Sequence, residues 1–318
     1  MSDTPTVSII IATFNWSSVL RYAIESALGQ TFQSFEVLVI GDGCTDDSAE
    51  VVASFGDPRI VWRNLPANSG NQSAPNNAGL HLARGKYVAY HGHDDVWHPT
   101  HLENLVRAIE ANEADVAYAG AVMIGPAESG VRIATGLADA YSPDLFFPPS
   151  SVMHRRDVVE QVGEWRDYRT ITQPPDKEFI GRIMEYRRRI AGTGALSVFK
   201  FNASWRRNSY VEKPCHEQAE YLRRIHSEPD FIANEMRAIE RARADRKIHS
   251  PVKIKMPSDP ESLPPGWQVE QWRAIRGLPP NALQPAPPPR TSLLRNFGRS
   301  MRRVLGSLTR RTGPGSRV

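Results

Sequence analysis

The first 125 residues alternate between buried-strand patterns and amphipathic-helix patterns, and this alternation most limits how the chain can fold. "VSIIIATF" (7–14) and "FEVLVIGDG" (35–43) contain continuous apolar, β-branched runs. Such runs are typical of strands that are covered on both faces. Between them, apolar residues recur at helical spacing from Leu20 to Leu28. The pattern predicts an α/β fold with a mostly parallel central sheet and helices on both faces.

Further elements follow in the same alternation. Strands are predicted at 59–64, 86–91, 115–124 and 195–207, and helices at 46–55, 75–84, 98–112, 174–189 and, as one long polar helix, 215–246. Between 125 and 170 the signals are short and broken. We therefore divide the chain into an α/β domain (1–215), a helical extension (216–250), a proline-rich linker or surface-hugging extension (251–289) and a basic amphipathic tail (290–318).

Charge is unevenly distributed along the chain. The tail holds eight arginines and no acidic residue, and the whole chain has a net charge of +4, so the remainder carries about −4. An acidic body without a recognisable binding module argues against nucleic acid as a partner. The stretch 290–311 has apolar residues on one helical face and arginines opposite, which suits an anionic membrane surface. The alternative is a disordered basic tail, because Gly298 and Gly306 weaken a helix.

Compartment signals are few. Two cysteines, Cys44 and Cys215, are too few for a disulfide framework and suit a reducing compartment. The N-terminal residues have no basic segment typical of a signal peptide, and no apolar run approaches the roughly 20 residues that span a bilayer. We expect a cytoplasmic protein, with a peripheral position at the inner membrane face if the tail binds lipid.

Acidic residues follow two of the predicted strands. Asp42 comes directly after the second strand, and Asp94 and Asp95 follow the fourth. In parallel α/β sheets, ligands bind outside the carboxyl ends of the strands. Carboxylates there would repel a diphosphate unless a cation lay between them, and oxygen ligands suit Mn²⁺ or Mg²⁺. Two alternatives stay open: Asp94 and Asp95 as N-terminal helix caps, and a zinc site among the nearby histidines.

Several separated motifs in order carry a resemblance to glycosyltransferase family 2. They lie within "VSIIIATFN", "AIESALGQTFQSFEVLVIGDGCTDDS" and "NSGNQSAPNNAGLHLARGKYVAYHGHDD". The resemblance covers about residues 6–125 and extends more loosely to about 210. It implies the GT-A fold, a nucleotide-sugar donor, a divalent cation bound at a "DxD"-type motif, and inversion at the anomeric carbon.

The resemblance also implies roles for particular residues of the donor site. Asp42 corresponds to the aspartate that recognises the nucleobase. Thr13, Phe14 and Asn15 correspond to the loop that lines the base pocket, and Phe14 would stack on the base.

At the "DxD" position, Asp95 would ligate Mn²⁺ or Mg²⁺ and Asp94 would contact the ribose or the sugar, with His93 beside the donor. In the segment "PPDKEF", Asp176 would be the catalytic base. Glu178 is the alternative base, and Asp176 is otherwise an ordinary first-turn helix residue.

The chain departs from the family pattern in three ways. The family often has two aspartates where this chain has "GDG", so Gly41 removes one possible contact with the ribose or the base. Many members carry an arginine near the diphosphate where this chain has Asn76, so neutralisation of the diphosphate would depend more on the metal. A "QxxRW" motif is missing, since "WRR" (205–207) lacks the glutamine. Its absence argues against a processive polysaccharide synthase.

These observations predict an inverting glycosyltransferase of the hexosyltransferase type. Its donor would be a nucleotide-diphosphate sugar, with uridine the commonest base in the family, and its acceptor the hydroxyl of a glycan or a lipid-linked sugar. Envelope polysaccharide is the expected destination. The alternatives are a non-catalytic nucleotide-sugar-binding module and a sugar nucleotidyltransferase. The latter usually requires a glycine-rich phosphate loop, which "IIIATFNWSS" does not provide.

Overall fold

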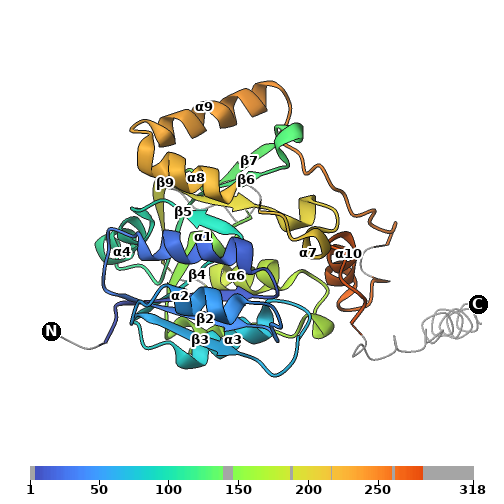
Figure 1. Cartoon of the computed structure of the whole chain (residues 1–318), viewed down its shortest axis with the longest axis horizontal. Coiled ribbons are helices and arrows are strands. Elements are labelled where there is room, and N and C mark those ends of the chain that lie inside the picture. Colours follow the sequence, from blue (N-terminus) through green and yellow to red (C-terminus); the bar gives the residue numbers. More distant parts are fainter. Residues whose placement is uncertain (1–3, 139–145, 187–188, 216, 260–261, 282–318) are drawn as a thin grey trace, which may run out of the picture. The chain divides into compact units, whose positions relative to one another are not determined.

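Nine strands of the described residues form one sheet, which lies at the centre of the fold (Figure 1). The structure is a computed structural model that describes residues 4–138, 146–186, 189–215, 217–259 and 262–281. The strands are β1 (Val7–Thr13), β2 (Phe35–Gly41), β3 (Ile60–Asn64), β4 (Tyr87–Tyr90), β5 (Asp95–Trp97), β6 (Val116–Ile124), β7 (Arg132–Thr135), β8 (Val152–Arg155) and β9 (Ile190–Phe201). Their spatial order is β3-β2-β1-β4-β8-β6-β9-β5, and β7 pairs with β6.

Helices connect the strands. They are α1 (Ser17–Leu28), α2 (Ser48–Ser54), α3 (Ser73–Leu82), α4 (His101–Ala111), α5 (Val158–Val162), α6 (Pro175–Glu185), α7 (Ser209–Glu212), α8 (Gln218–Ser227), α9 (Phe231–Ala244) and α10 (Trp267–Ile275). Short 3₁₀ helices are η1 (Ala127–Ser129), η2 (Pro149–Ser151), η3 (Tyr168–Thr170) and η4 (Ala203–Trp205). In the first 125 residues the described helices and strands alternate, except that β5 follows β4 directly. This order confirms the predicted α/β fold.

The sheet has two halves of different character. In β3-β2-β1-β4, which we call the parallel half, every pairing is parallel. In β8-β6-β9-β5 with β7, the mixed half, β6 and β9 are parallel whereas β8, β5 and β7 pair antiparallel to their neighbours. The sequence predicted none of β5, β7 and β8, because strands of three or four residues are too short to show a periodicity.

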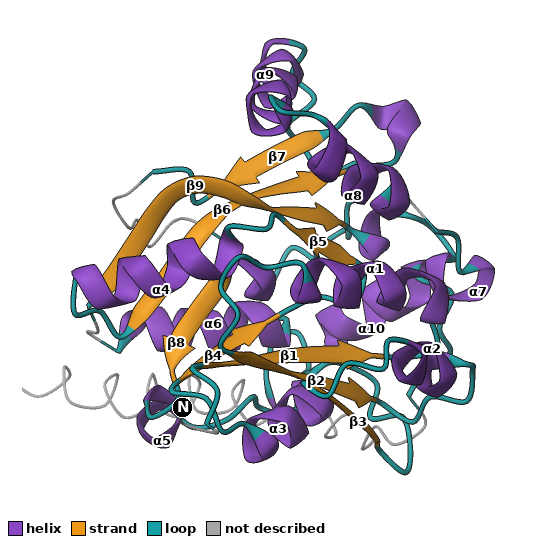
Figure 2. Cartoon of the chain, turned by 60° about the vertical axis from the view of Figure 1, so that its left-hand side comes forward, coloured by secondary structure: helices purple, strands orange, loops and turns teal. Residues whose placement is uncertain are grey.

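Alternate side chains of β1 pack against different helices. Ile9 and Ile11 belong to a core that also contains residues of α1, α2 and α4. Ile10 belongs to a second core with residues of α3, α5 and α6. Because successive strand residues point to opposite faces, both faces of the sheet are covered (Figure 2). This explains why the strand reads as a continuous apolar run and not as an alternating one.

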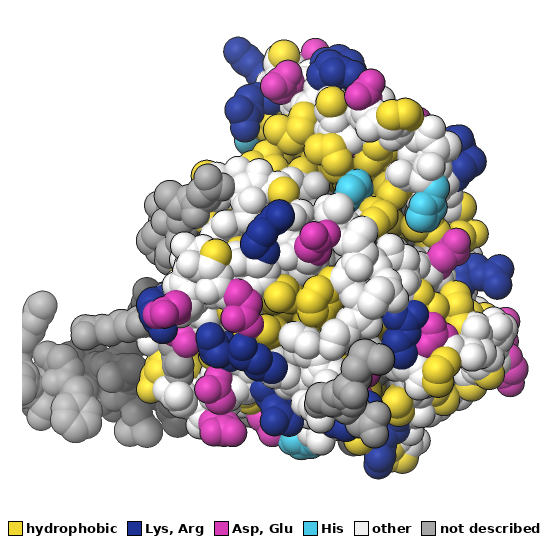
Figure 3. Space-filling view, turned by 90° about the vertical axis from the view of Figure 1, so that its left-hand side faces the viewer, with side chains coloured by type: hydrophobic (Ala, Val, Ile, Leu, Met, Phe, Trp, Pro, Cys, Tyr) yellow, Lys and Arg dark blue, Asp and Glu magenta, His cyan; other side chains and the backbone are white. Residues whose placement is uncertain are grey.

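The predicted long helix at 215–246 is two helices. It is interrupted between α8 and α9, where Pro229 prevents the residue before it from adopting helical geometry. Both helices contribute to a third core with β6 and β9, which includes Leu222, Phe231 and Phe199. In Figure 3, hydrophobic side chains gather at the top of the face shown, where α9 lies. The helical extension is therefore packed on the sheet and is not a separate module.

The proline-rich segment 251–289, predicted to be a linker or a surface-hugging extension, contains a helix. Residues 267–275 form α10, and a compact unit extends to Asn281. The helix is held by contacts with residues far away in the sequence, such as the hydrogen bond from Arg273 to the carbonyl of Gly70, and its own sequence does not reveal them. Residues 290–311, predicted to bind a membrane surface, lie outside the described residues. Among the described helices, none has the length and apolar character to cross a bilayer.

Candidate active site

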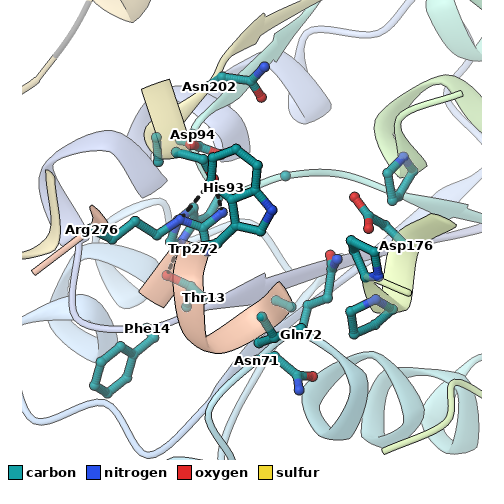
Figure 4. Close-up of a pocket in the computed structure, with 18 of the residues that line it drawn as sticks. Thr13, Phe14, Asn71, Gln72, His93, Asp94, Asp176, Asn202, Trp272 and Arg276 are labelled. Atoms are coloured by element: carbon teal, nitrogen blue, oxygen red, sulfur yellow. Dashed lines mark hydrogen bonds between the residues drawn. The ribbon is translucent and has the colours of Figure 1, made fainter. Parts of the chain in front are cut away.

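A cavity of about 420 Å³ opens where β1, β2 and β4 end. Its volume falls within the range of about 300–1,000 Å³ that is usual for small-molecule sites. The wall includes Thr13 and Asp42 from the parallel half and Asp176 from the start of α6. Figure 4 shows residues from several segments facing one another across this space, with Asp176 opposite His93 and Asp94. The position agrees with the rule that ligands bind beyond the carboxyl ends of parallel strands.

Asp42 lies buried at one end of the cavity. Its carboxylate accepts hydrogen bonds from the backbone N–H of Ser69, at 3.0 and 3.1 Å, and from the side-chain amide of Asn68, at 3.0 Å. Burial raises the pKa of Asp42, and the hydrogen bonds from Ser69 oppose that shift. Asp42 thus fixes the 68–69 loop and presents a buried acceptor where the sequence predicts contact with the base.

The loop after β1 forms part of the same wall. The hydroxyl of Thr13 lies 2.8 Å from Nδ1 of His93, and Nε2 of His93 lies 3.1 Å from the hydroxyl of Tyr210. Phe14 lines the cavity and stacks near Tyr210, with ring centroids 6.4 Å apart. Burial lowers the pKa of His93, so the ring is a neutral part of this hydrogen-bonded wall.

Asn15 has a different position from the one expected. Its side-chain oxygen accepts from the backbone N–H groups of Thr45 and Asp46, at 2.7 and 3.2 Å. It adopts a left-handed backbone conformation, φ 46°, which asparagine tolerates better than most residues. Within the described residues, Asn15 is not part of the cavity lining. Its contact with the donor stays a prediction, while its visible contacts hold the 45–46 loop.

Asp94 and Asp95 are adjacent but have different surroundings. Asp94 lines the cavity, and its backbone carbonyl accepts a hydrogen bond from Gln218. Asp95 begins β5, is fully buried, and pairs in register with Lys200 of β9. The ammonium of Lys200 lies 3.3 and 3.2 Å from the two carboxylate oxygens of Asp95, and Ser150 donates its hydroxyl to the same carboxylate.

The charges of this pair are mutually stabilised. Burial raises the pKa of Asp95, and the Lys200 ammonium opposes that shift. Burial lowers the pKa of Lys200, but the carboxylates of Asp95 and Asp94 outweigh it and raise the pKa above its usual value. Lys200 therefore carries a fixed positive charge at the edge of the cavity, which it also lines.

The described residues fit a divalent cation only if phosphate and water oxygens supply most of its ligands. Among the described residues, no three His, Cys, Asp or Glu side chains are grouped closely enough to form a cage for a metal ion. Mg²⁺ sites, however, commonly need only one or two carboxylates, with phosphate and water oxygens completing the shell. Asp94 lines the cavity, and Asp95 is fully buried in an ion pair with Lys200. The metal role predicted for Asp95 stays a prediction.

Asp176 and Glu178 can be compared directly on α6. Asp176 is half-buried, and its side chain lines the cavity. Glu178 forms ion pairs with Arg166 and Arg182, both at 2.9 Å. The second carboxylate is therefore occupied in holding the helix. Of the two predicted candidates for the base, Asp176 has the geometry that a substrate in the cavity can reach.

Two histidines near the carboxylates, His91 and His101, belong to the core. His91 stacks on Trp97 with ring centroids 4.0 Å apart, and Trp97 packs on His101 at 4.3 Å. Burial lowers the pKa of His91 to about 3, so it stays neutral. These contacts explain the histidine-rich sequence without a metal. No zinc-type cluster occurs among the residues that the structure describes.

Sequence reasoning missed several residues of the wall. Asn76 is buried in α3 and lines the cavity, as predicted, but Lys200, Trp272 and Arg276 line it too. Trp272 lies on α10, and Figure 4 shows its indole between the His93–Asp94 side and Asp176. Only "WRR" at 205–207 was considered as a tryptophan motif. The signal that might have helped is "EQWRAIRG", an aromatic and basic stretch inside a proline-rich segment.

Known proteins with similar sequences are glycosyltransferases. The chain is 34% identical over 122 residues to an uncharacterised glycosyltransferase of Rickettsia prowazekii (strain Madrid E), covering 38% of this chain and 37% of that protein. It is 32% identical over 112 residues to the Escherichia coli enzyme WfaP, named UDP-Glc:alpha-D-GlcNAc-diphosphoundecaprenol beta-1,3-glucosyltransferase, covering 35% and 44%. The succinoglycan biosynthesis protein ExoO of Rhizobium meliloti (strain 1021) is 30% identical over 156 residues, covering 48% and 44%. The matches thus span less than half the length of each relative.

The fold resembles that of solved glycosyltransferase structures. S. aureus TarS 1–349 in complex with UDP-GlcNAc is 17% identical, with a TM-score of 0.55, over 85% of this chain and 81% of that one. This similarity supports the GT-A arrangement of the sheet. The family model described as "Glycosyl transferase family 2" matches residues 8–207, which is most of the described catalytic part. The chain therefore belongs to glycosyltransferase family 2.

Proposed function

We propose that this protein transfers a hexose from a uridine-diphosphate sugar to an acceptor hydroxyl, with inversion at the anomeric carbon. The observation that carries the proposal is one cavity with Asp42 and Asp94 on its wall and Asp176 facing Asp94 across the space. A donor site needs a polar group for the base and a charged end for the diphosphate. A single-displacement reaction needs one carboxylate on the opposite side, and no covalent nucleophile.

The residues divide the work in the following way. Asp42, held by the 68–69 loop, recognises the base, while Thr13, Phe14 and His93 form the wall beside it. Asp176 removes the proton of the acceptor hydroxyl as that oxygen attacks the anomeric carbon from the side opposite the leaving diphosphate. Such a positioned base contributes typically about 10²- to 10⁴-fold to the rate.

A Mn²⁺ or Mg²⁺ ion, when bound, would neutralise the charge that develops on the departing nucleoside diphosphate. Asp94 is the carboxylate that could hold it from the cavity wall, as Asp95 is engaged by Lys200. Lys200 adds a fixed positive charge at the same end. The chain itself thus provides one anionic ligand for the cation and one permanent cation.

For the acceptor we propose a glycan or a lipid-linked sugar. Support comes from the names of two similar proteins, one of which acts on a diphosphoundecaprenol-linked sugar and the other of which takes part in succinoglycan biosynthesis. Because the matched segments span less than half of those proteins, the acceptor is assigned by class only.

The first experiment is a thermal-shift panel of nucleoside diphosphates and nucleotide sugars, with and without Mn²⁺. A ligand that binds the folded state adds about RT ln(1 + [L]/Kd) to the free energy of unfolding. UDP and UDP-sugars should therefore raise the Tm more than nucleotides with other bases do. The expected Mn²⁺-dependent increase tests the metal. A chain whose Tm responds to none of these ligands would contradict the proposal. A chain that binds UDP-sugars yet turns none over with any acceptor would be a binding module.

A further inference from the structure

The C-terminal arm, residues 266–281, is tied to three distant parts of the catalytic unit. The N–H of Gly266 donates to the carbonyl of Ile171 at 2.9 Å, Arg273 donates to the carbonyl of Gly70 at 2.6 Å, and Tyr210 donates its N–H to the carbonyl of Arg276 at 3.0 Å. The arm lies entirely beyond the part that matches the family model, which ends at residue 207. Residues of the arm line the cavity, so part of the cavity wall comes from a segment outside the family match.

The arm fits closely against the base end of the cavity. Gly70 has φ +96°, and a Cβ there would lie 2.6 Å from Nδ2 of Asn281 and 3.3 Å from Nη1 of Arg273. The positive φ favours glycine at this position, because other residues rarely adopt that conformation. α10 ends at Ile275, and Gly277, two residues later, has a φ of +81° that suits the end of a helix. These features fix the position of the residue just before the turn, Arg276.

Arg276 differs from the other basic residues on the cavity wall. Lys200 is paired with Asp95, and Arg273 donates to the carbonyls of Gly70 and Pro279. Lys177 is exposed on α6. The described hydrogen bonds of Arg276 go to one neutral acceptor, the Ser204 hydroxyl, at 3.1 Å from Nε and 2.5 Å from Nη2.

The charge of Arg276 is not neutralised by the residues around it. Among the described residues, no carboxylate lies within ion-pair distance of its guanidinium, which packs 5.7 Å from the ring centre of Tyr210. Figure 4 shows the side chain reaching from the end of α10 towards His93 and Thr13. A guanidinium has five N–H donors in a planar fork that matches phosphate oxygens. Ser204 leaves donors available for a ligand in the cavity.

We propose that Arg276 binds the diphosphate of the donor, so that the C-terminal arm completes the donor site. The inference rests on the proposed function. The diphosphate would be the negatively charged partner that the half-buried guanidinium of Arg276 does not find among the residues around it. The arm would then bind substrate as well as form part of the cavity wall. Arg276 recognises the diphosphate of the nucleotide, whichever sugar is attached to it.

The test compares UDP with uridine, which lacks the phosphates, on the full chain in EDTA. Arg276→Gln should weaken UDP binding about 10- to 100-fold, as expected for the loss of hydrogen bonds to a charged group, and leave uridine binding unchanged. Arg276→Lys keeps the charge and should retain an intermediate UDP affinity. The control is Arg207→Gln, which removes one positive charge from an exposed position outside the described cavity wall and should leave both affinities unchanged.

Two results would overturn the inference. Unchanged UDP affinity in Arg276→Gln would show that the guanidinium does not meet the diphosphate. An equal loss of UDP and uridine affinity would show that Arg276 only holds the arm in place. Both are measured against a wild-type chain that binds UDP. A wild-type chain that binds no nucleoside diphosphate, either in EDTA or with Mn²⁺, would instead contradict the proposed function.

Discussion

The parallel half of the sheet and the mixed half contribute to the cavity in different ways. Thr13 and Asp42 come directly at or after the ends of β1 and β2, so the strands alone bring them together. Lys200 meets Asp95 across 105 residues of sequence, and Arg273 reaches Gly70 across 203. The comparison teaches that Thr13 and Asp42 are positioned by the local order of the strands, whereas Lys200 and the C-terminal arm are positioned by contacts between residues far apart in the sequence.

The largest expected effect concerns Asp176, the proposed base, which lies on α6 outside the parallel half. Asp176→Asn should lower the transfer rate about 10²- to 10⁴-fold, because the amide cannot accept the acceptor's proton, while UDP affinity is unchanged. Glu185→Gln, an exposed change at the end of the same helix, is the control and should have no effect. Steady-state kinetics measure the transfer rate, and titration with UDP measures the affinity. Wild-type turnover in Asp176→Asn would assign the base to another residue.

The second prediction concerns the contact that joins β5 to β9. Lys200→Met should lower the free energy of unfolding by about 3–5 kcal/mol, because it leaves the fully buried Asp95 carboxylate without its cation. Urea unfolding measures it, and adding Asp95→Asn should recover much of the loss. Lys86→Met, which breaks a half-exposed pair with Glu110, is the control, with an expected change of no more than about 1 kcal/mol. Equal losses in the two variants would refute a special role of the buried pair.

The third prediction addresses the parallel half. Asp42→Ala should weaken UDP binding about 10- to 100-fold, because a buried acceptor is lost and the N–H of Ser69 loses its partner. Calorimetric titration of UDP measures the change, with Asp47→Ala at an exposed neighbouring position as the control. If Asp42→Ala bound UDP as the wild type does, base recognition would have to lie outside the end of β2.

The smallest effect concerns β8, where the two halves meet. His154 is buried, and its Nδ1 donates to the carbonyl of Arg155, while its Nε2 accepts from Tyr90. Burial lowers its pKa to about 4. Below pH 6.5 the unfolded chain binds a proton that the folded chain does not, so stability falls as the pH decreases towards 4. Between pH 7 and 5.5 this histidine should account for a loss of about 1 kcal/mol.

Unfolding at the two pH values measures that loss. His154→Gln should have a pH dependence smaller by this amount. An unchanged pH dependence in His154→Gln would mean that this histidine is not held neutral.

The same comparison explains what could be predicted from the sequence. Apart from β5, the order of elements up to β6 followed from strand and helix patterns, and the positions of Asp42 and Asp94 followed from their place directly after strands. Thr13 and Phe14 were assigned through the family resemblance. The short strands β5, β7 and β8 could not be predicted, because their pairing depends on partners far away in sequence. For the same reason, the engagement of Asp95 by Lys200 was not foreseen, and 267–275 was taken for part of a linker.

The anchors of the C-terminal arm have a consequence for synthesis of the protein. Every segment that the arm contacts, at Gly70, Ile171 and Tyr210, precedes it in the chain. A nascent chain therefore has the parallel half complete long before the last wall of the cavity exists. At about 5–20 residues per second, the roughly 175 residues between the end of β4 and the start of the arm take on the order of 10–35 seconds to translate. If Arg276 binds the diphosphate as proposed, the donor site is complete only once the arm has been synthesised.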